Sequence, residues 1–569
     1  MAHTLGKLTS GAASAVLLSA CALGPANHVP ALAAARGVAL EQCEPLASRF
    51  SAAHTQIGSA AMLEAGAMTQ AGQAIAAHCL VKGLVHTRQG SDGQTYAIGF
   101  EMRLPNAWNG RFYYQANGGL DGSVKTADGT LPGGQVTSAL IQGFAVISSD
   151  AGHTGKQTVA FGAEPQARLD DGYQAVARLT PMAKALIASA YGKAPDRSYI
   201  GGCSNGGRHA MVAASRMPDA YDGFLIGAPG YRLPLAALAQ IRSTQIWGTL
   251  TTPGTTVPHP MVPNATLPDL GSAFNSAERN SLSKALLARC DALDGAQDGL
   301  IQDVQACQTR FKLETDVPTC TGAREGQCLT PDQKTTVAQV FGGVRTPGGQ
   351  TIYAPFPLDT GVNGENRATW KFVNALVLDP LATGAVFSAP PGKVDPLKDD
   401  TDARLALFSA TTDVYRESAL SLMQPPCHEQ PMYMQAVAQR GGKLIAFHGT
   451  SDPVFSAEDT RAWIERARQI PGASDAVRYF PVPGMNHCSG GPATDQFDLL
   501  GPLVKWVEEG VAPQAITASV RRAGNAGGEN KELPADWSVT RSRPLCAYPT
   551  VATYNGRGDL ENAASFACR

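Results

Sequence analysis

The sequence predicts an α/β fold in which helices cover both faces of a mainly parallel β-sheet. Strand-like and helix-like stretches alternate from about residue 40 to residue 226, and such alternation is typical of a mainly parallel sheet. A glycine-containing turn at 202–206 separates a strand-like run from a helix-like run. The alternation of strand and loop resumes at Lys443, after a long stretch of different composition.

The strands are predicted from short apolar runs, each of which leads into a loop or turn. A helix is predicted over 169–191, where apolar residues recur at helical spacing. The predicted strands span 112–115, 144–147, 198–201, 443–448 and 477–482.

The turn after the strand at 198–201 has the sequence Gly-Cys-Ser-Asn-Gly. This sequence fits the G-x-S-x-G pattern of a nucleophile elbow, in which a serine lies on a sharp turn between a strand and a helix. Residues 206–217 have a helix-forming composition and complete that unit. Ser204 is therefore a candidate nucleophile.

A carboxylate and an imidazole that could complete a catalytic triad follow Ser204 along the chain. Asp452 lies on the loop just past the strand at 443–448, where open α/β sheets place functional groups. Taken alone, an aspartate before Pro453 is better explained as a turn former. A further strand then leads to His487, and the order Ser, Asp, His is that of α/β-hydrolases. We therefore predict Ser204, Asp452 and His487 as the triad.

Each of the two reacting side chains has a cysteine beside it, Cys203 next to Ser204 and Cys488 next to His487. A nucleophile and its base must approach to about 3 Å, which also brings their chain neighbours together. A disulfide needs Cα atoms roughly 4.4–6.8 Å apart, and this arrangement can supply that spacing. The sequence therefore predicts an active site that is cross-linked by Cys203 and Cys488.

These residues resemble the tannase and feruloyl esterase family, which is marked by a Cys-Ser pair, an aspartate and a His-Cys pair with bonded cysteines. The resemblance covers nearly everything after about residue 40 and is weakest between about 340 and 430. It implies an α/β-hydrolase fold and the hydrolysis of esters. Further matching motifs lie at 108–112, 227–230 and 484–491.

The predicted α/β-hydrolase fold carries a large lid domain inserted between the nucleophile and the acid. The stretch at 231–430 has clusters of proline and glycine, closely spaced cysteines and few strand-like runs. An insertion there would lie over the C-terminal edge of the sheet, directly above Ser204. The expected organisation is an export signal at 1–35, a first part of the core at 36–230, the lid at 231–430 and a second part of the core at 431–569.

An ester hydrolase also needs N–H groups that stabilise the oxyanion of the tetrahedral intermediate. In a nucleophile elbow, one donor is the backbone N–H of the residue after the nucleophile, here Asn205. The second donor comes from a glycine-rich loop after an early strand, and residues 115–120 form such a loop. The family resemblance implies Gly119 as that donor. Without Ser204, the same glycines would be interpreted as a simple turn.

An acidic loop at 290–300 is a candidate cation site. It holds three carboxylates in eight residues, together with glycines that let the backbone turn, and such oxygen ligands suit a hard cation. The spacing is not that of an EF-hand, and a solvated acidic turn is the alternative. Because the loop lies in the lid, the ion would be structural. The resemblance implies Ca²⁺ bound by Asp291, Asp294 and Asp298 and by the main-chain carbonyls of Ala296 and Leu300.

The chain has 12 cysteines, and an exported protein can oxidise such residues to disulfides. Cys21 falls in the predicted export signal and Cys427 is left over. We expect Cys427 to be a small buried hydrophobe, with an accessible thiol as the alternative. The resemblance implies the pairs Cys43–Cys79, Cys203–Cys488, Cys290–Cys307, Cys320–Cys328 and Cys546–Cys568.

The charge pattern excludes several classes of partner. Charged residues make up 17% of the chain and the formal net charge is −2. Because there is no basic stripe or polyanionic tail, nothing favours nucleic acid or an anionic membrane surface. After the N-terminal region, no stretch has the 18 or more uninterrupted apolar residues of a membrane helix. We expect a neutral or weakly charged small substrate.

The N-terminus has the features of a bacterial export signal, with Lys7 before a short apolar run at 12–18. A lipobox-like sequence ends at Cys21, which would then be lipidated and anchor the protein. An Ala-x-Ala site for ordinary cleavage ends at Ala33. We favour the lipoprotein because the apolar run stops at Cys21. Either reading predicts a secreted, periplasmic or outer-membrane-anchored protein.

Two other histidines have no assigned chemistry. His209 lies on the helix after the elbow and His448 ends a strand, so both are expected in the core or in support of the site. No group of cysteines and histidines has the spacing of a zinc site.

Substrate specificity is expected to come from the lid. Trp370 and Phe387 could stack on an aromatic acyl group or be ordinary lid-core aromatics. The terephthalate monoester hydrolase of the family holds its substrate's carboxylate with a lid arginine, and 369–373 and 381–388 contain none. We therefore expect a secreted serine esterase for feruloyl, galloyl or hydroxybenzoyl esters. Terephthalate monoester hydrolysis is one alternative, and a non-catalytic, calcium-stabilised ligand-binding protein is another.

Overall fold

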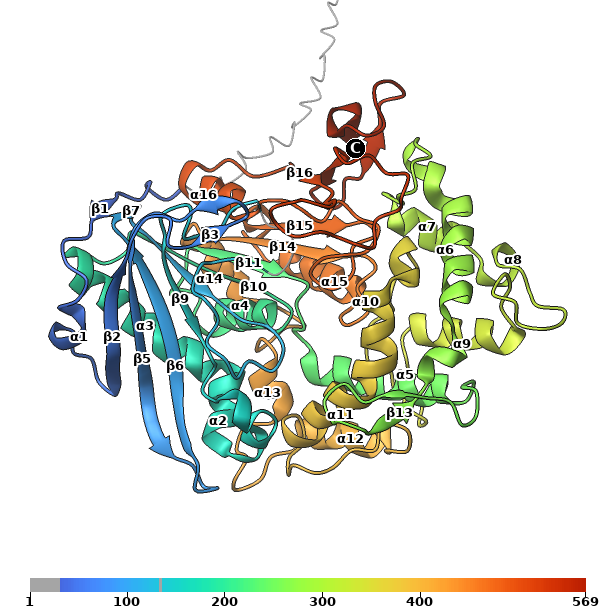
Figure 1. The fold of residues 1–569 in the computed structure, drawn as a ribbon, viewed down its shortest axis with the longest axis horizontal. Coiled ribbons are helices and arrows are strands. Elements are labelled where there is room, and N and C mark those ends of the chain that lie inside the picture. The colour runs from blue at the N-terminus through green and yellow to red at the C-terminus, as the bar shows by residue number, and fades with distance from the viewer. Residues whose placement is uncertain (1–30, 132–135) are drawn as a thin grey trace, which may run out of the picture.

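The computed structural model describes residues 31–131 and 136–569. Its centre is a sheet of nine strands (Figure 1). In spatial order these are β15 (Val477–Val482), β14 (Lys443–Gly449), β11 (Gly223–Gly227), β10 (Arg197–Cys203), β8 (Arg111–Gln115), β9 (Ala145–Ser149), β6 (Thr95–Pro105), β5 (His78–Gln89) and β2 (Thr55–Leu63). The strands from β15 to β9 run parallel, and β6, β5 and β2 extend the sheet in antiparallel pairs.

Helices cover both faces of this sheet, as predicted. Alternate residues of a strand point to opposite faces, so Phe224 and Ile226 of β11 join one hydrophobic cluster while Leu225 joins another. The cluster that holds Leu225 packs against α16 (Leu500–Glu509). The cluster that holds Phe224 packs against α3 (Ala175–Tyr191), α4 (Asn205–Arg216), α14 (Tyr433–Gln439) and α15 (Ala457–Gln469).

The predicted α/β fold is confirmed, and the predicted strands overlap β8, β9, β10, β14 and β15. The helix expected over 169–191 starts earlier, as α2 (Pro165–Leu169), with Pro165 in its first turn. It passes through a π-helical segment at Asp170–Gln174 before α3 begins. The spacing of apolar residues therefore locates this helical stretch but does not reveal its π-helical segment.

The segment at 231–430 is mainly helical and has a hydrophobic cluster of its own, which also takes in Phe161 and Phe455 from the flanking segments. In Figure 1 most of its helices, green to yellow, lie to the right of the sheet. The domain boundaries set from the sequence remain predictions. Its helices and strands are α5 (Leu233–Gly248), β12 (Thr256–Pro258), β13 (Thr266–Pro268), α6 (Ser276–Cys290), α7 (Val304–Arg310), α8 (Leu313–Asp316), α9 (Pro331–Phe341), α10 (Glu365–Ala368), α11 (Ala375–Ala385), α12 (Thr401–Ser409) and α13 (Ala419–Met423).

Local sequence signals explain where two of these helices begin. The side chain of Asn275 accepts a hydrogen bond from the backbone N–H of Glu278 at 3.0 Å, and the carboxylate of Glu278 accepts one from the backbone N–H of Asn275 at 2.9 Å. Thr330 and Gln333 form the same reciprocal pair before α9. Such capping boxes satisfy backbone N–H groups that the first turn leaves unpaired.

The remaining elements are short. They lie in the N-terminal part of the core and in the C-terminal segment after α16. They are β1 (Val38–Ala39), α1 (Leu46–Arg49), β3 (Thr69–Gln70), β4 (Gln73–Ala74), β7 (Ala107–Trp108), β16 (Ala515–Ser519), β17 (Ser542–Cys546), β18 (Ala552–Tyr554) and β19 (Phe566–Cys568).

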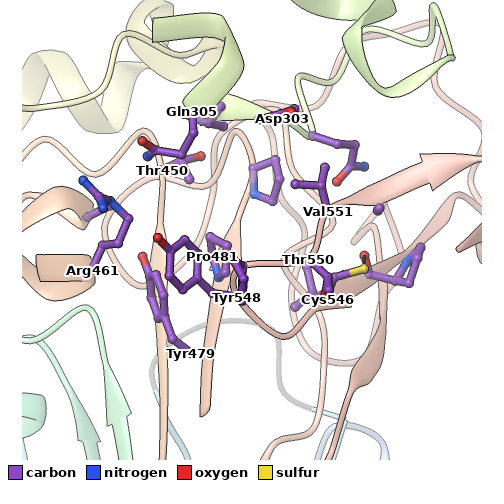
Figure 2. A pocket seen from close by; sticks show the side chains of 18 of the residues that line it. Asp303, Gln305, Thr450, Arg461, Tyr479, Pro481, Cys546, Tyr548, Thr550 and Val551 are labelled. Carbon is purple, nitrogen blue, oxygen red and sulfur yellow. Dashed lines mark hydrogen bonds between the residues drawn. The ribbon is translucent and has the colours of Figure 1, made fainter. Parts of the chain in front are cut away.

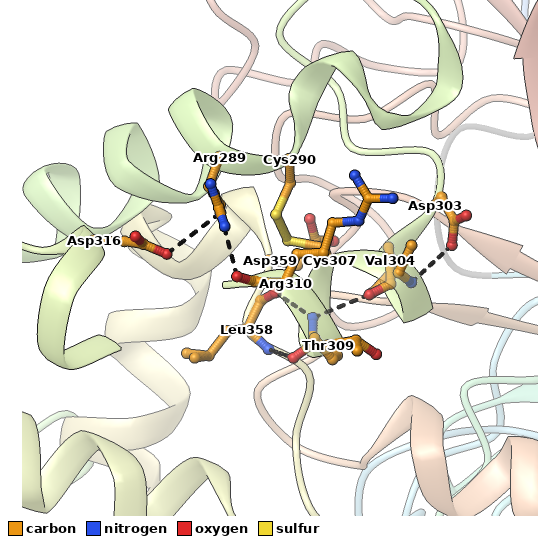
Figure 3. The surroundings of a disulfide bond; sticks show 12 residues. Arg289, Cys290, Asp303, Val304, Cys307, Thr309, Arg310, Asp316, Leu358 and Asp359 are labelled. Carbon is orange, nitrogen blue, oxygen red and sulfur yellow. Dashed lines mark hydrogen bonds and ion pairs between the residues drawn. A yellow bond between two sulfur atoms is a disulfide. The ribbon is translucent and has the colours of Figure 1, made fainter. Parts of the chain in front are cut away.

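Disulfides join the cysteine pairs that the family resemblance implies. Figure 3 shows Cys290–Cys307, which ties the end of α6 to α7 beside an ion pair of 3.8 Å between Arg289 and Asp316. The pairs are Cys43–Cys79, Cys203–Cys488, Cys290–Cys307, Cys320–Cys328 and Cys546–Cys568.

Cys427 is a free thiol, and the expectation that it is a small buried hydrophobe is wrong, because its side chain is exposed. It follows Pro425 and Pro426 in the loop between α13 and α14 and has a positive φ of 55°. A turn of this kind lies on the surface and encloses no apolar site for a thiol.

The predicted export signal falls largely outside the described residues, and Cys21 lies outside them. Ala33 lies within them, and the backbone N–H of its neighbour Leu32 donates to the carbonyl of Val507 at 2.9 Å. Neither of the two cleavage sites is tested by these contacts. In the part of the chain that the structure describes, no helix is both long enough and apolar enough to cross a membrane.

Candidate active site

Ser204 lies on a sharp turn between β10 and α4. Its backbone has a φ of 65° and a ψ of −127°, a region that L-residues rarely adopt and that marks strained functional turns. The flanking glycines are required by space, because a Cβ on Gly202 would lie 2.4 Å from the carbonyl oxygen of Ala116. A Cβ on Gly206 would lie 2.3 Å from the same oxygen. The G-x-S-x-G pattern is thus the sequence signature of a close backbone approach.

The three predicted triad residues lie together. The Nε2 atom of His487 is 2.8 Å from Ser204 Oγ, and its Nδ1 atom is 2.7 Å from Asp452 Oδ2. Since a carboxylate can only accept, Nδ1 carries the hydrogen and Nε2 is free to accept the serine proton. This is the geometry of a nucleophile, a base and an orienting acid.

Asp452 follows β14 directly and is fully buried. Its Oδ1 atom accepts hydrogen bonds from the backbone N–H groups of Val454, at 2.7 Å, and Phe455, at 3.1 Å. Burial alone would raise the pKa of Asp452, but the charge of protonated His487 and hydrogen bonds from His448 and His487 hold it well below its usual range. The carboxylate therefore stays ionised beside the imidazole.

Close backbone packing and a disulfide place His487. A Cβ on Gly449 would lie 2.3 Å from the carbonyl oxygen of Met485, so only glycine lets the two loops meet. Cys203 and Cys488 are bonded, with Cα atoms 6.1 Å apart, and Cys488 has a positive φ of 63°. The predicted cross-link therefore joins the chain neighbours of Ser204 and His487.

The two predicted oxyanion donors lie beside Ser204, because Gly119 and Asn205 line the same pocket as the serine. Gly119 has a positive φ of 69°, which favours glycine at this position. The side chain of Asn205 donates to Asp121 Oδ2 at 2.9 Å, and this oxygen also contacts His209 Nε2 at 3.0 Å.

Asp121 is thus a site residue that sequence reasoning missed, although it follows the glycine-rich loop directly. Burial raises the pKa of Asp121 to about 7, against the opposing charge of Arg208. Its contacts to Asn205 and His209 connect the loop to the start of α4. His209 is a buried residue that supports the site, as expected.

The pocket at Ser204 is narrow, with a volume of about 50 Å³. Both predicted substrate-binding residues line it: Trp370, from a π-helical segment at Thr369–Asn374, and the buried Phe387. The ring of Trp370 lies edge-on to His487, with centroids 5.5 Å apart. The segment at 231–430, here called the inserted segment, therefore forms a wall of the pocket that Ser204 faces.

A larger cavity of about 270 Å³ lies elsewhere, between the inserted segment, α15 and the C-terminal segment (Figure 2). Tyr479, Pro481, Tyr548 and Val551 are among its lining residues, and none of the three triad residues is. The smaller pocket is the candidate active site because its wall carries the serine and both predicted oxyanion donors.

The acidic loop fits a cation at one of its carboxylates. Asp294 is 2% exposed, and its Oδ2 atom has no hydrogen-bond partner among the described residues. Burial raises the pKa of Asp294 to about 7, and the charges of Asp298 and Asp291 add to that rise. A buried, unpaired carboxylate oxygen is a suitable ligand for a hard cation.

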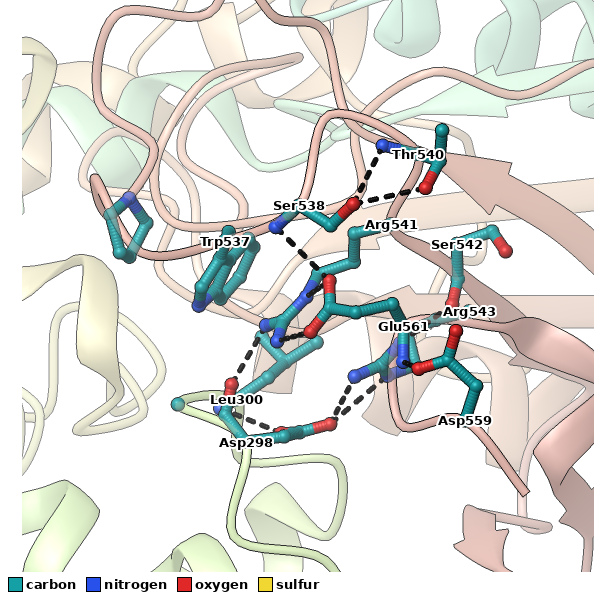
Figure 4. A network of polar contacts seen from close by, with 12 residues as sticks. Asp298, Leu300, Trp537, Ser538, Thr540, Arg541, Ser542, Arg543, Asp559 and Glu561 are labelled. Atoms are coloured by element: carbon teal, nitrogen blue, oxygen red, sulfur yellow. Dashed lines mark hydrogen bonds and ion pairs between the residues drawn. The ribbon is translucent and has the colours of Figure 1, made fainter.

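The rest of the loop is already engaged by the protein. Asp291 accepts from the backbone N–H groups of Asp298 and Gly299. Arg543 forms an ion pair with the carboxylate of Asp298, and Arg541 donates to its carbonyl at 2.7 Å (Figure 4). Among the described residues, no group of three or more His, Cys, Asp or Glu side chains is placed to hold a metal ion. The loop thus fits a cation only in part, and calcium remains a prediction.

Sequence comparison relates the chain to known esterases. It is 36% identical over 557 residues to mono(2-hydroxyethyl) terephthalate hydrolase of Piscinibacter sakaiensis, covering 91% of this chain and 89% of the relative. It is 27% identical over 489 residues to a probable feruloyl esterase B-1 of Aspergillus fumigatus, covering 82% of each.

Solved structures share the fold. Feruloyl esterase B from Aspergillus oryzae has a TM-score of 0.70 at 23% identity, covering 92% of this chain and 98% of that one. Tannin acyl hydrolase from Aspergillus niger has a TM-score of 0.64 at 21% identity, covering 93% of each. These likenesses confirm the predicted α/β-hydrolase fold. The family described as tannase and feruloyl esterase matches residues 79–569, and the chain therefore belongs to this family of carboxylic ester hydrolases.

Proposed function

We propose that this chain is a serine esterase that hydrolyses feruloyl, galloyl or hydroxybenzoyl esters, which are esters of aromatic carboxylic acids, through an acyl-enzyme on Ser204. The observation that carries the proposal is the hydrogen-bonded series from Ser204 through His487 to Asp452, with contacts of 2.8 Å and 2.7 Å. Membership of the family supports an ester substrate. The aromatic walls that Trp370 and Phe387 give the pocket support an aromatic acyl group.

In the first half of the proposed reaction, Ser204 Oγ bonds to the ester carbonyl carbon while its proton passes to His487 Nε2. The carbonyl oxygen becomes an oxyanion, to which the backbone N–H groups of Asn205 and Gly119 donate. Losing one such donor typically costs about 2.7–4 kcal/mol of transition-state stabilisation. His487 then gives its proton to the departing alkoxide, so the alcohol leaves and the acyl group stays on Ser204.

In the second half, a water molecule attacks the acyl carbon and His487 takes its proton. The tetrahedral intermediate collapses, the proton returns to Ser204 Oγ and the carboxylic acid is released. Asp452 stays ionised throughout and stabilises the imidazolium that forms twice in the cycle. Its low pKa and its hydrogen bonds to two histidines support this role.

Hydrolysis of a terephthalate monoester is the second candidate, favoured by the name of the relative that is 36% identical. Against it, the described residues that line the pocket include Asp379 and no arginine. Methyl ferulate, methyl gallate and mono(2-hydroxyethyl) terephthalate, assayed side by side, separate the two candidates. A higher kcat/KM for the terephthalate monoester than for both phenolic esters would overturn the first choice.

A serine-directed phosphonylating reagent distinguishes an esterase from a non-catalytic ligand-binding protein on the same fold. We expect stoichiometric labelling of Ser204, and loss of both labelling and hydrolysis in Ser204→Ala. An unlabelled wild-type protein that still binds aromatic esters would favour the binding protein.

We further propose a structural Ca²⁺ in the acidic loop, held by Asp291, Asp294 and Asp298 with the carbonyls of Ala296 and Leu300. The unpaired Oδ2 atom of Asp294 supports it. The ion would balance buried negative charge and takes no part in the reaction.

We also propose that the protein is exported, which its disulfides support because they persist in oxidising compartments. The mass of the mature N-terminus distinguishes a lipid-modified Cys21 from a chain cleaved after Ala33.

A further inference from the structure

The pocket that Ser204 faces contains one charged side chain that the reaction above does not use. Asp379 lies on α11 and is the only charged residue among the described residues that line this pocket. Its carboxyl group is half-buried and has no hydrogen-bond or ion-pair partner elsewhere in the described chain. A carboxyl group that lines a pocket and has no partner in the protein is available to a ligand.

The polar groups behind Asp379 are already committed to one another. Lys371 Nζ donates to Gln240 Oε1 at 2.9 Å and lies 4.1 Å from the centre of the Phe356 ring. Among the described residues, Lys371 forms no ion pair with Asp379. The amide nitrogen of Gln240 donates to the carbonyl oxygens of Pro453, at 3.0 Å, and Val454, at 3.1 Å.

Gln240 and Asp379 therefore offer the pocket only hydrogen-bond acceptors. Both amide hydrogens of Gln240 have partners, so it can only accept further hydrogen bonds, and an ionised Asp379 can only accept as well. An acceptor-rich wall stabilises a ligand that donates. The same wall repels a ligand that carries a carboxylate of its own.

We propose that Asp379 is a specificity-determining residue, which accepts a hydrogen bond from a hydroxyl group on the aromatic ring of the substrate's acyl part. This proposal rests on the proposed esterase function. The hydrogen bond to Asp379 would select phenolic esters over terephthalate monoesters. Ala382 and Phe387 line the same pocket, so apolar side chains for an aromatic ring and an acceptor for its hydroxyl group lie in one pocket.

The state of the carboxyl group is compatible with that role. Burial raises the pKa of Asp379 to about 7, and the charge of Lys371 opposes this only in part. A carboxylate accepts from a phenolic hydroxyl, and a protonated carboxyl group still accepts through its carbonyl oxygen. Hydrogen bonds to charged groups are the stronger kind, and sites built around them reject analogues that lack the hydroxyl.

The test compares esters that share one leaving group. For wild type we expect kcat/KM to be about 10- to 100-fold higher for the better of methyl 4-hydroxybenzoate and methyl gallate than for methyl benzoate. Asp379→Leu replaces both carboxylate oxygens by methyl groups, removes the acceptor and should bring this ratio close to 1. Asp379→Asn removes the charge and should raise kcat/KM for monomethyl terephthalate at least 10-fold. Asp413→Asn, at an exposed acid of the inserted segment, should change neither.

Because each preference is a ratio within one variant, partial loss of folded protein cancels, and melting temperature together with labelling of Ser204 confirms the fold. An unchanged phenolic preference in Asp379→Leu would overturn this proposal and leave the esterase proposal intact. If the Ser204→Ala variant hydrolysed these esters at the wild-type rate, the esterase proposal itself would be overturned.

Discussion

The Nε2 atom of His448 lies 3.1 Å from Asp452 Oδ2, the same oxygen that His487 contacts at 2.7 Å. The ring of His448 is fully buried, and its Nε2 atom also lies 3.0 Å from the carbonyl oxygen of Phe455. Because a carboxylate and a carbonyl can only accept, Nε2 carries the hydrogen, and Nδ1 lies 2.8 Å from the hydroxyl of Thr460. One carboxylate oxygen thus accepts from two imidazoles, of which one faces the serine.

His448 is therefore a positioning residue, and its loss should slow the chemical step. We expect His448→Phe to lower kcat by about 10-fold or more, because a hydrogen bond to a buried charged group is lost, while KM changes little. His448→Gln, which retains an N–H donor, should recover part of the loss. Asp413→Asn serves as the control because this residue is exposed and lies in the segment at 231–430. An unchanged kcat in His448→Phe would contradict this role.

The disulfide between Cys203 and Cys488 should matter for catalysis as well as for stability. We expect the double variant Cys203→Ser, Cys488→Ser to lose activity at temperatures where its circular dichroism is still native, because Cys488 holds a strained backbone beside His487. The double variant Cys546→Ser, Cys568→Ser removes a distant cross-link and should lower the melting temperature while keeping kcat. Equal turnover in the first variant and wild type would count against the prediction.

Removal of calcium should destabilise the protein and leave its chemistry unchanged. We expect a chelator to lower the melting temperature, and added Ca²⁺ to restore it, because binding to the folded state alone adds stability. In Asp294→Asn the chelator should have a much smaller effect. Turnover per folded molecule at 25 °C should stay the same. A melting temperature that does not respond to the chelator would remove the case for the ion.

Asp150 should make stability fall as the pH rises. Burial raises its pKa to about 7, against hydrogen bonds from the N–H groups of Gly152 and Gly99, whereas the ordinary value is 3.8. The folded state therefore binds the proton more tightly. This contribution is fully present below about pH 4 and is lost as the pH rises through about 7, at roughly 1.4 kcal/mol for each unit of difference.

The conservative substitution Asp150→Asn tests that dependence. Both backbone hydrogen bonds go to Oδ1, at 2.9 Å each, and an asparagine oxygen can accept them. We expect the variant to gain melting temperature over wild type between pH 5 and pH 8, as measured by thermal scans in matched buffers. Asp413→Asn should follow wild type at every pH. A constant difference between Asp150→Asn and wild type would exclude Asp150 as the source.

Most of the fold, and the meeting of Ser204, Asp452 and His487, could be predicted because both leave local signals. Glycine is required on both sides of Ser204 because a Cβ there would lie 2.3–2.4 Å from a backbone oxygen, and such a constraint has to appear in the sequence. The π-helical segment at Asp170–Gln174 was not predictable, since apolar periodicity is too coarse to show it. Cys427 was misjudged because its exposure depends on how two prolines turn the chain.

By itself the sequence determined which residues can carry the chemistry, in which order they come and what kind of sheet supports them. Only the tertiary structure decided which polar groups have hydrogen-bond or ion-pair partners within the protein and which can bind a ligand. In the sequence His448 and Asp121 have no distinguishing signal. In the fold, His448 contacts Asp452 and Asp121 contacts Asn205. The role proposed for Asp379 also depends on tertiary structure, because segments far away along the chain decide whether its half-buried carboxyl group has a partner.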